Sequence, residues 1–189
     1  MSDEVEQSKE MIRRELLGRV RGLGGRRPGL DQALCERLEH LPEIKQARSI
    51  LAFAPLPSEP GIDPLIERWT GSTRQVLLPK VGSQPGEMAA VTLETGLEEL
   101  PCDALGVRTP CGERWKQGID LILVPGCGFD RELGRLGRGG GYYDRFLMQQ
   151  GDTLKVGICF ECQVIDRLPT ESHDQSVDLI VTESRVLGL

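Results

Sequence analysis

Residues 119–147 read IDLILVPGCGFDRELGRLGRGGGYYDRFL, and this stretch decides the fold. Its beginning, residues 119–125, is almost wholly apolar and lies between two glycines, which is the pattern of a short buried strand. Its end leads into residues 142–150, which contain no helix breaker and stop at Gly151, so we expect a helix there. A strand, a glycine-rich loop and a helix in this order indicate an α/β unit.

The loop between this strand and helix, residues 126–141, has the composition of an anion-binding loop. Glycine N–H groups and a helix N-terminus attract anions, and arginine adds a planar fork that suits phosphate. The loop exceeds the ~2–6 residues usual between a strand and a helix, which favours a functional loop. The alternative is a glycine-rich surface loop with solvated arginines. Its second half carries Gly134, Gly137, Gly139, Gly140 and Gly141 together with Arg135 and Arg138.

Neither of the two best-known phosphate loops fits these residues. A P-loop ends in Gly-Lys-Ser/Thr, and residues 126–141 contain no lysine. A dinucleotide fingerprint needs Gly-x-Gly-x-x-Gly, but counting from Gly137 and Gly139 the last position is Tyr142. A nicotinamide-dependent dehydrogenase is therefore not expected.

The run FDRELGRLGRGGGYYDRFL, following DLILVPG, closely resembles the signature of the 5-formyltetrahydrofolate cyclo-ligase family, also called methenyltetrahydrofolate synthetases. The resemblance extends from Lys9 to Glu183 and is most specific in residues 120–147. It implies a single domain over residues 1–189. Strands that alternate with helices along the chain indicate an α/β fold with a mostly parallel sheet covered on both faces. The family fold is similar to a modified Rossmann-like sheet without the dinucleotide fingerprint.

Composition is that of a soluble globular chain. The 189 residues suit one domain, and 39% of them are apolar while 28% are charged. No apolar run approaches the ~20 residues of a membrane span, and the first ten residues are acidic, unlike a signal peptide. We expect a cytoplasmic monomer with no membrane partner and with reduced thiols. Cys159 and Cys162 form a CxxC without a second pair, so buried thiols are preferred over a redox pair.

The charge is unevenly distributed. A formal net charge of −6 argues against general nucleic-acid binding. Residues 9–27, however, contain seven basic and two acidic side chains, and the glycine loop is a second basic region. An acidic protein with two basic regions is suited to hold a compact polyanion in a cleft.

The first basic region is predicted to be an amphipathic helix. Ile12, Leu16 and Val20 recur at helical spacing, while Lys9 and Arg13 share another face. An ordinary solvated basic face is the alternative interpretation. The resemblance implies that Lys9 and Arg13 hold the phosphates of ATP, because family members are similar in having a lysine and an arginine four residues apart near the start.

A folate pocket is implied around the first predicted strand. Residues 30–41 are predicted to form a helix capped by Asp31, and residues 49–54 a strand followed by a proline-rich loop. The resemblance implies that Glu59 in this loop accepts hydrogen bonds from the pterin ring and that Ala54 lines the same pocket. A carboxylate suits the adjacent N–H donors of a pterin. The family commonly has Glu-x-Asp/Glu-Thr here, whereas residues 59–63 read Glu-Pro-Gly-Ile-Asp.

Two aspartates are implied to bind magnesium. The resemblance assigns Asp144, in the YYD segment, and Asp174, in the His-Asp pair, to Mg²⁺, which usually takes one or two carboxylates plus phosphate oxygens and waters. An acidic residue such as Asp144 is also favourable in the first turn of a helix without any metal. His173 is interpreted as a structural or supporting residue rather than as a base.

The implied activity is ATP-dependent, carbon–nitrogen bond-forming cyclisation of 5-formyltetrahydrofolate to 5,10-methenyltetrahydrofolate with release of ADP and phosphate. Two alternatives stay open, namely an ATP-binding paralogue of the same fold without formylfolate activity and a phosphate-sensing module without catalysis. ATP and Mg²⁺ are the expected cofactors, and a folate and ATP the expected small-molecule partners. The residues assigned to catalysis are Arg138 and Tyr143; to ATP, Lys9, Arg13, Arg135, Gly137, Arg138, Gly139, Gly140, Gly141, Tyr142 and Tyr143; to the folate, Ala54, Glu59 and Tyr143; to the metal, Asp144 and Asp174.

Overall fold

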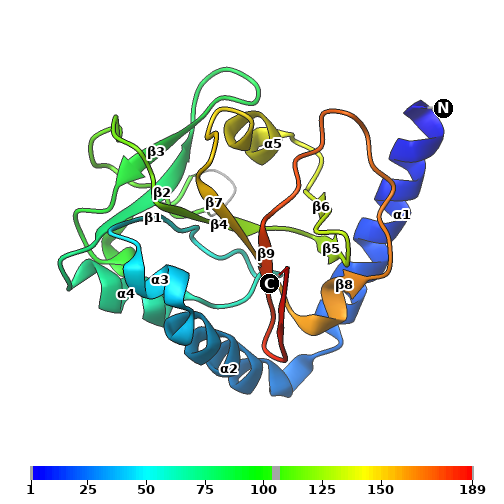
Figure 1. The fold of residues 1–189 in the computed structure, drawn as a ribbon, viewed down its shortest axis with the longest axis horizontal. Coiled ribbons are helices and arrows are strands. Elements are labelled where there is room, and N and C mark those ends of the chain that lie inside the picture. Colours follow the sequence, from blue (N-terminus) through cyan, green and yellow to red (C-terminus); the bar gives the residue numbers. More distant parts are fainter. Residues whose placement is uncertain (1, 104–106, 189) are drawn as a thin grey trace.

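A twisted, mostly parallel sheet forms the centre of the protein, as seen in a computed structural model that describes residues 2–103 and 107–188 (Figure 1). Within these residues the sheet has seven strands in the order β10-β9-β7-β4-β1-β2-β3. The five inner strands run parallel, and β3 and β10 close the two edges in antiparallel pairing. The predicted α/β class with a mostly parallel sheet is therefore confirmed. The strands are β1 (Ser49–Leu51), β2 (Gln75–Val81), β3 (Met88–Thr92), β4 (Leu121–Pro125), β7 (Leu154–Ile158), β9 (Leu179–Val181) and β10 (Val186–Leu187).

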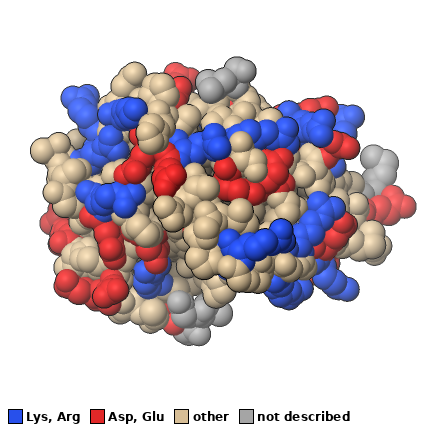
Figure 2. Space-filling model, turned by 90° about the horizontal axis from the view of Figure 1, so that it is seen from below, with Lys and Arg blue, Asp and Glu red and all other residues tan. Residues whose placement is uncertain are grey.

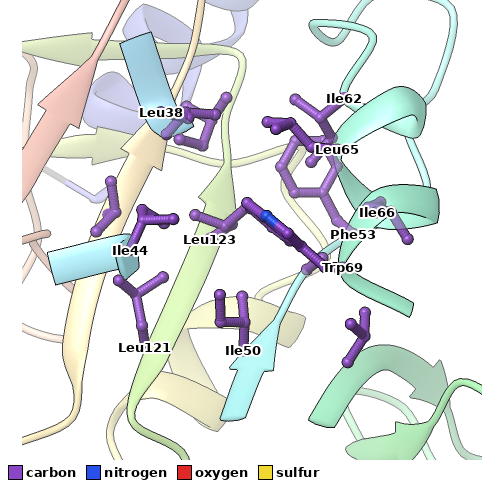
Figure 3. Packing of buried hydrophobic residues seen from close by; sticks show 14 of the residues in the cluster. Leu38, Ile44, Ile50, Phe53, Ile62, Leu65, Ile66, Trp69, Leu121 and Leu123 are labelled. Carbon is purple, nitrogen blue, oxygen red and sulfur yellow. The ribbon is translucent and has the colours of Figure 1, made fainter. Parts of the chain in front are cut away.

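One face of the sheet is covered by three helices, α2 (Arg27–His40), α3 (Pro42–Gln46) and α4 (Asp63–Thr70) (Figure 1). Leu121 and Leu123 are alternate residues of β4 and therefore share one face of the sheet. They belong to the same buried cluster as the side chains of these helices. Figure 3 shows the helix side chains that meet them and Ile50 of β1. The labelled helix-side residues are Leu38, Ile44, Ile62, Leu65, Ile66 and Trp69.

The other face is covered by the short helix α5 (Tyr142–Leu147) and by a small second sheet, which has three strands in the described part of the chain. The central feature of this cover is Phe129, which is fully buried and packs so closely on β7 that a Cβ at Gly157 would lie 2.6 Å from its ring. Because β4 is buried on both faces, its sequence is a continuous apolar run. The small sheet contains β5 (Gly128–Asp130), β6 (Arg135–Leu136) and β8 (Val164–Ile165).

The long helix α1 (Ser2–Arg21) lies beside this small sheet, at one side of the molecule (Figure 1). Leu16 is buried, and a Cβ at Gly128 of β5 would lie only 2.2 Å from its Cδ1 atom. Ile12 packs against the buried cluster formed by Cys127, Leu136 of β6 and Leu168. The predicted apolar stripe of this helix thus docks α1 on the segment that carries the glycine loop. Three 3₁₀ turns complete the described structure: η1 (Gly24–Arg26), η2 (Leu97–Glu99) and η3 (Glu161–Gln163).

The structure corrects several predicted boundaries. Residues 126–141 are not one open loop, because β5 and β6 form a hairpin inside them. Its turn is braced by the buried carboxylate of Asp130, which accepts the N–H groups of Glu132 and Gly134. Strand β1 ends at Leu51 rather than at Ala54, and β3 lies in a stretch for which the sequence predicted no element.

The predicted cap of the second helix is also wrong. Helix α2 begins at Arg27, with Pro28 in its first turn, where the missing N–H of proline has no helical partner to lose. Asp31 is therefore inside the helix, and its carboxylate accepts the N–H of Gly61 instead of capping.

Charged side chains of both signs are mixed on the surface. On the face seen in Figure 2, basic and acidic side chains lie next to one another. Arg68 of α4, for example, pairs with Glu39 of α2 at 2.8 Å. No helix of the described chain has the length and apolarity to cross a bilayer.

The six cysteines, all of which lie in the described ranges, are free thiols. Cys159 is fully buried and Cys162 partly so. Burial raises the pKa of both thiols, which disfavours the thiolate that redox exchange requires.

Leu123→Ala tests the central position of β4. Leu123 is fully buried under the helices, so its truncation leaves a cavity, and we expect the free energy of unfolding to fall by about 2–5 kcal/mol. Urea unfolding followed by circular dichroism measures the change. Met148→Ala is the control, since Met148 is 60% exposed and its truncation should change stability by less than about 0.5 kcal/mol.

Candidate active site

A cavity of about 210 Å³ opens at the carboxyl ends of β1, β2 and β4, where open α/β sheets bind their ligands. Ala54 follows β1 on one side of it, and Pro125 ends β4 on another. Most residues that the sequence assigned to the site meet here. Those that line the cavity are Ala54, Glu59, Arg135, Gly137, Arg138, Gly140, Gly141, Tyr142, Tyr143 and Asp144.

The glycine loop turns into α5 through two residues with positive φ. Gly139 has φ +96° and Gly141 has φ +64°, values that other residues adopt only with strain. Gly141 is the N-cap of α5, so the glycine loop leads directly into the start of this helix. Tyr142 and Tyr143 follow at once and line the cavity.

Arg138 and Glu59 form an ion pair across the cavity. Arg138 Nη2 lies 3.0 Å and Nε 3.2 Å from Glu59 Oε1, and Nη2 also donates to Ser58 Oγ at 2.7 Å. The other carboxylate oxygen of Glu59 accepts the N–H of Leu56 at 2.9 Å. Glu59 is only 5% exposed. The arginine assigned to phosphate and the carboxylate assigned to the pterin ring are thus in direct contact.

Arg135 connects the end of β4 to the start of α5. Its Nη1 donates to the carbonyl of Pro125 at 3.1 Å, and its Nη2 lies 3.2 Å from both carboxylate oxygens of Asp144. The guanidinium also lies over the ring of Tyr143, 5.5 Å from its centroid. Arg135 is 7% exposed, so these contacts supply partners for both terminal nitrogens of a buried cation, while its buried Nε has no hydrogen-bond partner among the described residues.

A second buried cation, Lys9 of α1, is held by the turn that carries Asp174. Lys9 Nζ lies 2.7 Å from Asp174 Oδ2 and 2.9 Å from Glu171 Oε2. Burial alone would lower the pKa of Lys9, but the hydrogen bonds and charges of the two carboxylates outweigh it and raise the pKa. Burial would raise the pKa of Asp174, and Lys9 together with the Glu171 N–H reverses this, so the pKa of Asp174 is lowered.

Arg13 holds the glycine loop from α1. Its Nε donates to the carbonyl of Gly137 at 2.9 Å, and its Nη1 pairs with Glu6 at 2.7 Å. The guanidinium lies close to Gly139, since a Cβ there would be 3.7 Å from Arg13 Cζ. Lys9, Arg13, Gly139 and Asp174 do not line the cavity itself. Arg13 and Gly139 adjoin residues that do, whereas Lys9 is bonded to Glu171 and Asp174, which lie outside the lining.

The two predicted metal ligands are connected through the backbone of the turn that carries Asp174. Asp144 Oδ1 accepts the N–H of Gln175, the residue after Asp174, at 3.3 Å. In the described residues there is no group of three or more His, Cys, Asp or Glu side chains arranged to hold a metal. Any cation bound here would therefore need oxygen ligands from a second molecule in addition to the aspartates.

Tyr143 presents a buried hydroxyl to the site. Its oxygen is shielded from solvent and has no hydrogen-bond partner among the described residues. Burial raises the pKa of Tyr143 far above its ordinary value, so the hydroxyl keeps its proton and remains a donor at neutral pH. An unsatisfied donor beside a cavity is costly unless a ligand accepts from it.

Sequence reasoning missed residues that act on the site through tertiary contacts. Glu171 shares Lys9 with Asp174, and Ser58 shares Arg138 with Glu59. Arg27, at the start of α2, donates to the backbone carbonyls of Pro57 and Glu59. None of these roles has a local sequence signal, because each depends on a partner far along the chain or on the shape of a loop.

Comparisons with known proteins agree on one family. The model of the 5-formyltetrahydrofolate cyclo-ligase family matches residues 5–183. A protein of Schizosaccharomyces pombe described as a probable 5-formyltetrahydrofolate cyclo-ligase is 31% identical over 174 residues, covering 82% of this chain and 84% of that protein. The NMR structure of the 5,10-methenyltetrahydrofolate synthetase of Aquifex aeolicus matches with a TM-score of 0.82 at 33% identity, over 95% of this chain and 91% of the other. The corresponding enzyme of Mycoplasma pneumoniae gives 0.74 at 26% identity, over 93% and 98%.

Asp174→Asn tests the Lys9 ion pair through its pH dependence. Because the pKa of Asp174 is lowered by folding, its ionised form stabilises the protein above the unfolded pKa of about 3.9, and this stabilisation is lost as the pH falls through the folded value. The difference in free energy of unfolding between wild type and the variant should thus be largest near pH 7 and shrink below about pH 4. Urea unfolding of both proteins at pH 3 to 7 measures this difference. An equal difference at pH 3 and at pH 7 would contradict the ion pair between Lys9 and ionised Asp174.

Proposed function

Because the chain belongs to the 5-formyltetrahydrofolate cyclo-ligase family, we propose that it catalyses the ATP-dependent closure of 5-formyltetrahydrofolate to 5,10-methenyltetrahydrofolate, releasing ADP and phosphate. The observation that carries this proposal is the contact between Arg138 and Glu59 inside one cavity. A phosphoryl transfer to the formyl group requires a phosphate-binding group and a folate-binding group side by side. That arrangement supports an enzyme with two substrates rather than a phosphate sensor.

The proposed reaction makes a poor leaving group into a good one. The formyl oxygen attacks the γ-phosphorus of ATP, the bond to the β-phosphate oxygen breaks, and ADP leaves. Nitrogen 10 of the folate then attacks the activated formyl carbon, the carbon–oxygen bond breaks, and phosphate departs with the proton of nitrogen 10. Such chemistry asks the protein mainly for in-line positioning and for neutralisation of charge.

The residues around the cavity have separate parts in this scheme. Arg138 and the N–H groups of the glycine loop bind the transferring phosphoryl group. Tyr143, whose raised pKa keeps it protonated, donates a hydrogen bond to an oxygen of that group. Glu59 accepts from the pterin N–H donors and orients the ring. Lys9 and Arg13 bind the phosphates from the side of α1.

Magnesium would be held by Asp144 and Asp174 together with phosphate oxygens of ATP. The residues fit the ion because Asp144 bonds the residue that follows Asp174 and Mg²⁺ needs only one or two carboxylates. The ion would supply charge neutralisation on the β- and γ-phosphates. Arg135 and Lys9, which now pair with these carboxylates, orient them.

Binding of ATP requires an exchange of partners. In the proposed complex, phosphate takes over the Nε and Nη2 groups of Arg138 that now hold Glu59, and this frees the carboxylate for the pterin. The two substrates should therefore strengthen each other's binding. ATP must raise the affinity for the folate by the same factor by which the folate raises the affinity for ATP.

Glu59→Gln tests this exchange directly. Loss of the carboxylate releases Arg138, so we expect a non-hydrolysable ATP analogue, with Mg²⁺ and without folate, to bind about threefold to tenfold more tightly, as measured by calorimetry. Arg138→Ala should weaken the same binding and lower turnover. In the double variant the tightening should disappear, which separates the effect of Arg138 from the general loss of a negative charge.

The activity itself is tested by the near-ultraviolet absorbance of the methenyl product. Purified protein with 5-formyltetrahydrofolate and Mg-ATP should produce this band, and omission of ATP should abolish it. A flat trace in a protein that still binds the ATP analogue would overturn the proposed reaction and favour an ATP-binding paralogue with another substrate.

A further inference from the structure

We infer that Arg27 and Asp31, in the first turns of α2, are positioning residues for the folate: they clamp the loop of residues 56–61 so that the Glu59 carboxylate faces the cavity. The inference rests on the proposed function, in which Glu59 receives the pterin ring. Neither residue lines the cavity, so both act through the loop.

The clamped loop is short and irregular. Its Pro60 has no N–H to donate. Within residues 56–61 the described structure has one backbone–backbone hydrogen bond, from the N–H of Glu59 to the carbonyl of Leu56. A short irregular loop of this kind needs outside partners for its remaining backbone groups. Those partners come from α2.

Arg27 supplies the first anchor. Its two terminal nitrogens donate to the carbonyls of Pro57 and Glu59, which lie two residues apart in the loop. The planar guanidinium holds both carbonyls at once, and a lysine ammonium has no such fork. The guanidinium lies over the ring of the fully buried Phe160, 5.6 Å from its centroid, so its own position is fixed.

Asp31 supplies the second anchor, one helical turn further on. Its Oδ1 accepts the N–H of Gly61 at 2.7 Å, and its Oδ2 lies 3.6 Å from Arg27 Nε. A Cβ at Gly61 would lie 3.3 Å from the Asp31 carboxylate, so glycine is the residue that allows this close approach without a shift. Cys35, a further turn along, donates to the carbonyl of Gly61 with a sulfur–oxygen distance of 3.5 Å. One face of α2 thus holds both ends of the loop.

The clamp decides where Glu59 points. The N–H of Leu56 occupies Oε2, and Oε1 is left facing Arg138 and the cavity. A displacement of the loop by about 1 Å would misplace this oxygen relative to a flat ring and weaken paired hydrogen bonds. Arg27 therefore controls the affinity for the folate, and its removal should have little direct effect on the phosphates.

Hydrogen exchange in the ligand-free protein tests whether the clamp exists. Arg27→Ala should speed the exchange of the amides of Leu56 and Gly61 at least about tenfold, because both depend on the fixed loop. Arg26→Ala is the matched control, since Arg26 is the exposed neighbouring arginine and should leave these amides unchanged. Unchanged exchange in Arg27→Ala overturns the clamp.

Steady-state kinetics test whether the clamp serves the substrate. Arg27→Ala should raise the KM for 5-formyltetrahydrofolate about tenfold, with kcat within about threefold and no rise in the KM for ATP. Arg27→Lys should restore part of the affinity, because lysine can reach one of the two carbonyls. In a Glu59→Gln background the Arg27→Ala effect on this KM should largely vanish.

The outcomes separate the two proposals. Two results would overturn the inference, because each would mean that Arg27 only stabilises the structure. The first is a lower kcat in Arg27→Ala with both KM values unchanged. The second is an undiminished rise of the KM for 5-formyltetrahydrofolate when Arg27→Ala is combined with Glu59→Gln. A wild-type protein without turnover overturns the proposed reaction and the folate part of the inference with it. The exchange measurement still decides, in that case, whether α2 holds the loop.

Discussion

A buried cation needs a carboxylate partner, and this requirement organises the whole site. Arg135 joins the end of β4 to the start of α5, and Lys9 joins α1 to the turn at Glu171 and Asp174. Arg138 in turn joins the glycine loop to the loop of Glu59. An unpaired charge on buried Arg135, Lys9 or Glu59 would cost several kcal/mol in the protein interior, whereas Arg138 is partly exposed. The same pairs that lower this cost also hold together segments between which the described structure has no backbone hydrogen bond.

This arrangement keeps the site in shape without ligands. Lys9 and Arg13, the buried cations proposed to meet phosphate, already have carboxylate partners that orient them, so part of the entropy of binding is lost on folding rather than on association. Glu59 and Arg138 differ, because in the proposed function each changes partner, and Arg138 is the more exposed of the two. The site therefore combines fixed pairs near α1 and α5 with one exchangeable pair between its two loops.

The sequence predicted the elements whose signals are local. β4 is a continuous apolar run between two glycines, and α1 has an apolar stripe at helical spacing, so both could be predicted from the residues alone. The residues of the site came from the resemblance, and ten of them do line one cavity. The features that could not be predicted depend on contacts between distant parts of the chain. β6 has two residues and β8 has two, which is too short for a pattern, and Glu59 pairs with an arginine 79 residues away.

The docking of α1 has a consequence for synthesis on the ribosome. Lys9 is made 162 and 165 residues before its partners Glu171 and Asp174. The surface that α1 covers includes η3, whose residues are also made long after this helix. While β1, β2 and β4 can pair as they emerge, the helix that carries the first basic region must wait until residues 161–174 have been made. A chain that stops before residue 161 would thus keep β1, β2 and β4 but lack the ion pairs that hold α1, so incomplete products should lack the proposed phosphate site.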